Sequence, residues 1–67
     1  MFTPDEVVEY NNVLYVVDCD TEEYVYLFNE NDTQRVNVWG RQDIKNRGDV
    51  NVKFEIFRYH RVPVFEV

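Results

Sequence analysis

Few side chains in this chain are able to act as nucleophiles or bases. The 67 residues contain no serine, one cysteine (Cys19) and one histidine (His60), which are 41 positions apart. A cysteine nucleophile needs a histidine in contact and a third group that orients it. Cys19 alternates with Tyr15 and Val17, so we interpret it as a thiol packed among apolar side chains. The sequence therefore predicts a protein with no catalytic activity, no small-molecule substrate and no cofactor.

The densest group of carboxylates follows one short segment. Asp18, Asp20 and Glu22 alternate along the chain, which is the spacing of oxygen ligands at the start of a calcium-binding loop. The glycine that such a loop requires is replaced by Glu23, and no helical pattern flanks the segment. We interpret these residues as a solvated turn and expect no metal site.

The charges are divided along the chain. Residues 1–34 carry nine acids and no base, whereas residues 35–67 carry seven bases and four acids. This division predicts either a molecule with two oppositely charged sides or halves that are joined by ion pairs between strands. The acids of the first half also allow a second interpretation, in which they imitate the phosphates of DNA and inhibit a nucleic-acid-binding protein.

The basic second half suggests an alternative site for nucleic acid. Its cations would contact phosphates, and Trp39, Phe57 and Tyr59 would stack on bases. The formal net charge of −6 opposes this interpretation, because it repels a polyanion at long range. The residues of this alternative site are Arg35, Arg41, Lys45, Lys53, Arg58 and Arg61.

Composition and turn residues predict an all-β fold in a single domain spanning residues 1–67. Thirteen valines and eleven aromatic residues favour strands, and alanine, the best helix former, is absent. Turn residues divide the chain, and a phase change near Phe57 within the last strand indicates a bulge that helps a small sheet to close. We expect strands at residues 6–10, 13–19, 24–28, 35–39 and 50–61, with one helical turn within 41–47. The expected architecture is a small antiparallel barrel of five or six strands.

Alternation within these strands predicts two faces. The expected core is an aliphatic set: Leu14, Val16, Val25, Leu27, Val36, Val38, Val52, Phe54 and Ile56. The expected opposite face carries aromatic side chains that would bind a partner: Tyr15, Tyr24, Tyr26, Phe28 and Trp39.

The first half of the chain resembles a known type of fold. The segment from Val7 to Val17 leads through Asn11-Asn12 into Leu14-Tyr15-Val16-Val17, and Tyr24 to Phe28 follows. This arrangement is similar to the opening hairpins of SH3-like small barrels, which are common among short phage and prophage proteins. The resemblance covers about residues 5–45, and Asn12 stands where a glycine is usual. It implies a fold and no particular activity.

The expected function is protein–protein interaction by a small binding module. The partner would be another protein, such as a host protein inhibited by a phage-encoded chain, or a second copy of this chain. Tyrosine and tryptophan suit this role because they bury a large area at low entropic cost. No stretch is long and apolar enough to span a membrane. The acidic start and the single cysteine favour the cytoplasm.

Overall fold

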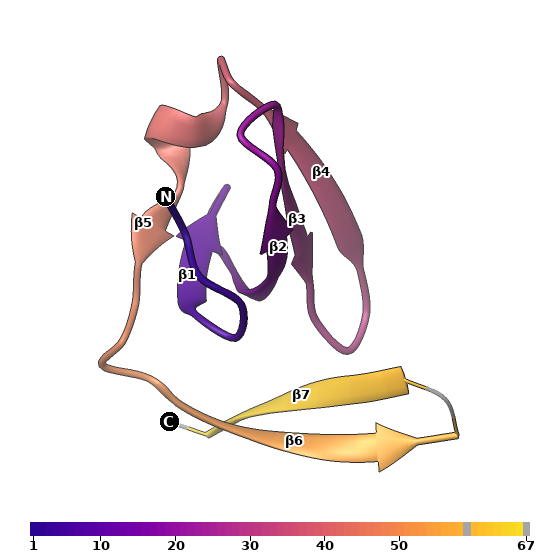
Figure 1. Ribbon diagram of the computed structural model, residues 1–67. Helices are drawn as coiled ribbons and strands as arrows, with labels where there is room; N and C mark the ends of the chain where they lie inside the picture. The colour runs from indigo at the N-terminus through magenta and orange to yellow at the C-terminus, as the bar shows by residue number, and fades with distance from the viewer. Residues whose placement is uncertain (59, 67) are drawn as a thin grey trace.

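The chain folds into two antiparallel sheets, as a computed structural model of residues 1–58 and 60–66 shows (Figure 1). One sheet has five strands in the order β4-β3-β2-β1-β5, and the other is the hairpin β6–β7. A single 3₁₀ turn, η1, precedes β5. The elements are β1 (Val7–Tyr10), β2 (Val13–Asp20), β3 (Tyr24–Phe28), β4 (Thr33–Asn37), η1 (Arg41–Asp43), β5 (Lys45–Asn46), β6 (Asn51–Phe57) and β7 (His60–Glu66).

The predicted all-β class and the single helical turn are confirmed, but the predicted closed barrel is wrong. β5 contributes only two residues to the five-stranded sheet, where it pairs with β1. The chain after residue 50 does not extend that sheet and instead pairs with itself. Closure fails because the segment expected to supply a long closing strand forms a separate hairpin.

Local turn chemistry sets the strand ends in the first half. Asn11 and Asn12 both have positive φ, 51° and 64°, as the tight β1–β2 hairpin requires. The next strand, β3, has the predicted bounds. β4 begins two residues earlier than predicted, because the amide of Asn29 donates to the carbonyl of Asp32 (2.9 Å) and closes the turn, so that Thr33 pairs with Phe28.

A β-bulge at Asp18 changes the phase of β2. Val17 pairs with Leu27, but Cys19 pairs with Tyr26, so Asp18 is the extra residue. The bulge turns Cys19 to the face opposite Val17 and turns Asp20 to the face that carries Val25. The prediction that Cys19 packs beside Tyr15 and Val17 is therefore wrong.

The core lies on one face of the five-stranded sheet and differs in part from the predicted set. Val25, Leu27 and Val36 are buried as expected. Tyr15 is 4% exposed and belongs to the core rather than to the opposite face, whereas Val38 is 51% exposed. In β2, the residues that face this cluster are Tyr15 and Val17, so Leu14 and Val16 point the other way. Val16 is fully buried on that other face, as predicted, whereas Leu14 is only half-buried. The core cluster comprises Val8, Tyr15, Val17, Val25, Leu27, Val36 and Ile44, with Phe2 and Tyr10 packed against it.

The C-terminal segment is a hairpin rather than the single long strand predicted for residues 50–61. β6 and β7 pair from Asn51 opposite Glu66 to Phe57 opposite His60, which leaves two residues for the connection. Arg58 has φ 58°, and Tyr59 lies outside the described residues. The phase change near Phe57 marks this turn and not a bulge. Ile56, which was expected in the core, is 82% exposed.

Two valines near the end of β4 distinguish the observed core from the predicted one. Val36 is 3% exposed and Val38 is 51% exposed, although the sequence pattern placed both inside. We expect Val36→Ala to lower the free energy of unfolding by about 2 kcal/mol, because it removes buried methyl groups. Val38→Ala should change it by less than about 0.5 kcal/mol. Urea denaturation measures both, and equal losses would contradict the observed packing.

Candidate functional site

Three aromatic side chains lie along the outer face of β3. Tyr24, Tyr26 and Phe28 alternate with the buried Val25 and Leu27, so they point away from the core. The rings of Tyr24 and Tyr26 are 6.3 Å apart between centroids and are tilted by 50°, which is a favourable arrangement for an aromatic pair. All three side chains are half-buried. We call Tyr24, Tyr26 and Phe28 the aromatic face.

The neighbouring strand adds a cation to this face. Arg35 on β4 pairs with Tyr26, and its guanidinium carbon lies 4.6 Å from the centroid of the Tyr24 ring. This cation–π contact orients the Arg35 side chain along the aromatic face while the residue stays exposed. The face therefore offers both apolar area and a hydrogen-bond donor.

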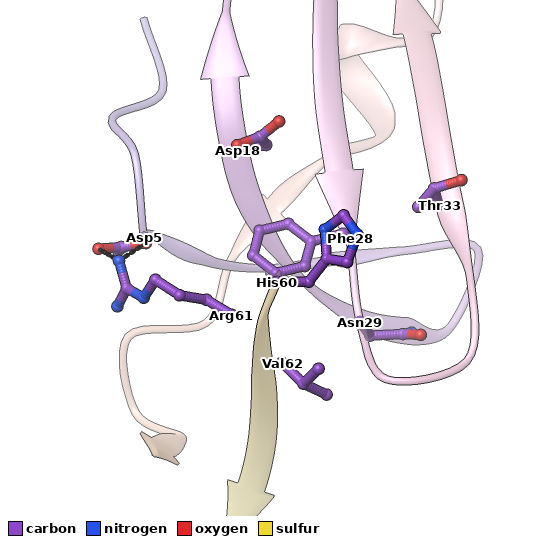
Figure 2. A pocket seen from close by; sticks show the side chains of 8 residues that line it. All are labelled: Asp5, Asp18, Phe28, Asn29, Thr33, His60, Arg61 and Val62. Atoms are coloured by element: carbon purple, nitrogen blue, oxygen red, sulfur yellow. Dashed lines mark hydrogen bonds and ion pairs between the residues drawn. The ribbon is translucent and has the colours of Figure 1, made fainter. Parts of the chain in front are cut away.

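Two adjacent clefts run along the aromatic face and share Asp18, Phe28 and Thr33. One, of about 450 Å³, reaches Tyr26 and Arg35. The other, of about 470 Å³, reaches the start of β7 and is seen in Figure 2. We call the two clefts together the β3 groove. Its lining residues on the hairpin are His60, Arg61 and Val62.

An ion pair attaches the hairpin at the end of the groove. Arg61 donates to the Asp5 carboxylate at 3.2 Å, drawn as a dashed line in Figure 2, and its guanidinium lies 4.0 Å from the centroid of the Phe54 ring. On the other wall, the side-chain amide of Asn29 donates to the carbonyl of Leu14 at 2.9 Å. These contacts hold the side chains of Arg61 and Asn29 in place at the two ends of the groove. Asp18 also lines the groove and presents its carboxylate to it.

The structure does not bring together all of the predicted partner-binding residues. Tyr24, Tyr26 and Phe28 share one face, but Tyr15 lies in the core, where its hydroxyl donates to Asp32 at 2.9 Å. Burial, together with the Asp32 carboxylate, raises the pKa of Tyr15. Trp39 is 81% exposed and lies between β4 and η1, beyond the strand that carries the aromatic face.

Three of the six cations of the predicted basic site are held in ion pairs within the molecule. Arg41 pairs with Asp20, Lys53 with Glu66 at 3.1 Å, and Arg61 with Asp5. Arg47, from the same half of the chain, pairs with Glu9 at 2.6 Å and with Asp49 at 3.0 Å. Three acids of the first half are thus paired with bases of the second half, although none of these three pairs links one strand directly to another in the way that the charge division had predicted.

The Asp20–Arg41 pair is the most enclosed of these contacts. The Asp20 side chain is 1% exposed and that of Arg41 is 23% exposed. Both guanidinium nitrogens of Arg41 donate to the carboxylate, and the amides of Phe2 and Glu22 donate to it at 2.9 Å each. Hydrogen bonding to Arg41 is the main reason that the pKa of Asp20 lies far below its usual value, against the opposing effect of burial.

Sequence reasoning did not find the groove. Asp18 was counted with the solvated turn, although it is the bulged residue of a strand, and His60 was considered only as a partner for Cys19. The phase change near Phe57 was the available signal, because a turn at that point returns His60 and Val62 toward the body of the molecule. Nothing in the sequence indicated that these residues would face Phe28.

Comparison with models of protein families, with curated proteins and with solved structures gave no match. No helix among residues 1–58 and 60–66 is long and apolar enough to cross a membrane. Among the same residues, no three or more His, Cys, Asp or Glu side chains form a group that could hold a metal ion.

The Asp20–Arg41 pair predicts a loss of stability in acid. Because the pKa of Asp20 is lower in the folded state than its unfolded value of about 3.9, its contribution is fully present above that value. The contribution is lost as the pH falls from there through the folded-state pKa. Asp20→Asn should cost about 1.5–3 kcal/mol at neutral pH, because it replaces the charged hydrogen bonds of the carboxylate with weaker neutral ones while the guanidinium of Arg41 stays partly in water. The free energy of unfolding of this variant should also fall less steeply as the pH is lowered.

The matched control is Asp43→Asn, which makes the same charge change at an exposed residue of η1. We expect it to change the free energy of unfolding by less than about 0.5 kcal/mol. Chemical denaturation at a series of pH values measures both variants. An Asp20→Asn variant as stable as the control would show that the ion pair does not support the fold.

Proposed function

We propose that this chain is a non-catalytic binding module that uses the β3 groove to bind another protein. The observation that supports this most is the aromatic face: three aromatic side chains line one side of a strand and remain half-exposed. Aromatic residues that remain half-exposed beside a groove supply contact area at low entropic cost, as interface anchors do. Trp39, at 81% exposure, is a second anchor outside the groove.

The chemistry of the groove favours an extended segment of a partner protein. Aromatic rings of Tyr26 and Phe28 would contact apolar side chains, while Asp18 accepts and Arg35 donates hydrogen bonds at the edges. A ligand of mixed apolar and polar character meets both requirements. A protein segment has this character, whereas the phosphates of a nucleic acid would meet Asp18 and Asp5 in the same groove.

We further infer that the five-stranded sheet is related to SH3-like small barrels. The support is the order of elements: four strands in succession, a single 3₁₀ turn, and a short last strand that returns to pair with the first. The sheet stays open in this chain, so the relation concerns topology and not closure.

The binding proposal predicts that Tyr26 is a main contact. Tyr26→Ala should weaken binding of the partner by about 2 kcal/mol, or roughly thirtyfold, because it removes a central aromatic anchor. Tyr26→Phe keeps the ring and should retain most of the affinity. The measurement is capture of a partner from an extract of the source organism, followed by calorimetry with the purified partner. A partner that binds Tyr26→Ala as tightly as the unaltered chain would place the interface elsewhere.

The nucleic-acid alternative has its own test. Because three of the six predicted contact cations are held in ion pairs, we expect no binding of short oligonucleotides even at low salt. Fluorescence anisotropy with labelled single-stranded and double-stranded oligonucleotides measures this. Micromolar binding that is abolished by Arg58→Glu would favour the alternative and overturn the proposal.

A further inference from the structure

The strand β6 presents one long edge that no other strand of the described chain covers. β6 has seven residues and pairs only with β7. A two-stranded hairpin is marginally stable in water, and an uncovered edge offers unpaired N–H and C=O groups to another strand. The backbone groups on the outer side of β6 are therefore able to pair with another strand.

The free edge faces away from the rest of the molecule. In Figure 1, β7 lies on the side of the five-stranded sheet and β6 on the far side. Burial agrees with this view, because Pro63 on β7 is buried and Val62 lines the β3 groove. On β6, Ile56 and Phe57 are 82% and 67% exposed. A strand that adds to β6 would meet no part of the five-stranded sheet of the same copy.

The position of Pro63 shows which backbone groups of β6 point outward. Pro63 is opposite Phe54 and has no N–H to donate, so this pair is a non-hydrogen-bonded pair of the hairpin. The two-residue connection after Phe57 has the same implication, because Phe57 and His60 then form the hydrogen-bonded pair that closes the hairpin. By alternation, the N–H and C=O groups of Val52, Phe54 and Ile56 point outward.

The sequence of β6 is complementary to itself in one antiparallel register. When Phe54 is opposite Phe54 of a second copy, Val52 is opposite Ile56, and these are the residues whose backbone groups point outward. The same register puts Lys53, which is 72% exposed and also pairs with Glu66 of its own copy, opposite Glu55 of the second copy. This contact occurs twice by symmetry, in non-hydrogen-bonded pairs where side chains are closest.

The neighbouring registers are opposed by charge. A shift of one residue would set outward backbone groups against inward ones and break the hydrogen bonds. The next registers that restore the hydrogen bonds put Lys53 opposite Lys53, or Glu55 opposite Glu55, and like charges directly opposite each other are destabilising. Of these registers, only the one with Phe54 opposite Phe54 satisfies both the backbone and the charges.

We propose that the β6 edge binds the β6 edge of a second copy of this chain and forms a symmetric dimer. The two hairpins then make one four-stranded antiparallel sheet in the order β7-β6-β6-β7, with the two-fold axis at Phe54. The interface also covers apolar surface, because the exposed Ile56 side chain comes to lie beside Val52 of the second copy. It uses none of the residues of the β3 groove, so this proposal stands or falls independently of the binding function proposed above.

The charge pairs supply a test with two complementary variants. Glu55→Lys puts lysine opposite lysine, and Lys53→Glu puts glutamate opposite glutamate, so each variant alone should raise the dimer dissociation constant by more than about tenfold. An equimolar mixture of the two variants should restore a dimer, because opposite charges again face each other. Sedimentation velocity of the full chain over a range of concentrations measures each sample.

The matched control is Glu30→Lys, which makes the same charge change at an exposed residue of the β3–β4 turn. It should leave the dissociation constant unchanged. Hydrogen exchange of the unaltered chain gives a second readout. The amides of Val52, Phe54 and Ile56 should become protected only as concentration rises, whereas those of Lys53 and Glu55, which face β7, should be protected at every concentration.

The proposal would be overturned by a chain that remains monomeric at millimolar concentration, by a dimer that persists in Glu55→Lys, or by a mixture of the two variants that fails to associate. Dimerisation with protection of amides on β4 instead of β6 would equally reject it.

Discussion

A single buried carboxylate joins three parts of the chain that are distant in sequence. Asp20, at the end of β2, accepts hydrogen bonds from Arg41 at the start of η1 and from the amide of Phe2 near the N-terminus. The ring of Phe2 also lies 5.7 Å from the Arg41 guanidinium. The N-terminal segment and the turn that leads into β5 are thereby fixed against the same strand. In a domain of this size, where burial of apolar surface only just exceeds the entropy of ordering, such a contact has a large share in stability.

The bulge at Asp18 is the local feature that makes this contact possible. In a regular strand of the same sequence, strict alternation after Tyr15 and Val17 would direct Cys19 inward and Asp20 outward. The bulge reverses that order, so Asp20 faces Arg41, while Asp18 stays on the outer face and lines the β3 groove. The irregularity in β2 therefore places the carboxylate on which the stability of the fold depends.

The sequence predicted those features that depend on local chemistry. The asparagine pair Asn11-Asn12, the bounds of β3 and the helical turn before β5 all follow from residues a few positions apart. Tyr15 was misplaced because alternation alone cannot say which of two apolar faces is covered, and both faces of β2 carry apolar residues. The hairpin was missed because Arg58 has φ 58° without being glycine or asparagine, so the usual signal of a tight turn was lacking. The groove depends on contacts between residues more than 30 positions apart, about which local patterns carry no information.

The irregularity in β2 also bears on how such a chain is able to vary. Many side chains at position 18 would suit a bulged residue that is exposed on the surface. Removing the residue would also keep the interior, because the ladder would then run without interruption from Val17 opposite Leu27 to Cys19 opposite Tyr26, and Asp20 would still lie opposite Val25. The face on which Asp20 lies is thus set by its pairing with β3 and not by the presence of residue 18. In comparisons among descendants of this chain, a gap at this point would leave the interior unchanged, whereas a substitution of Asp20 would signal a rebuilt one.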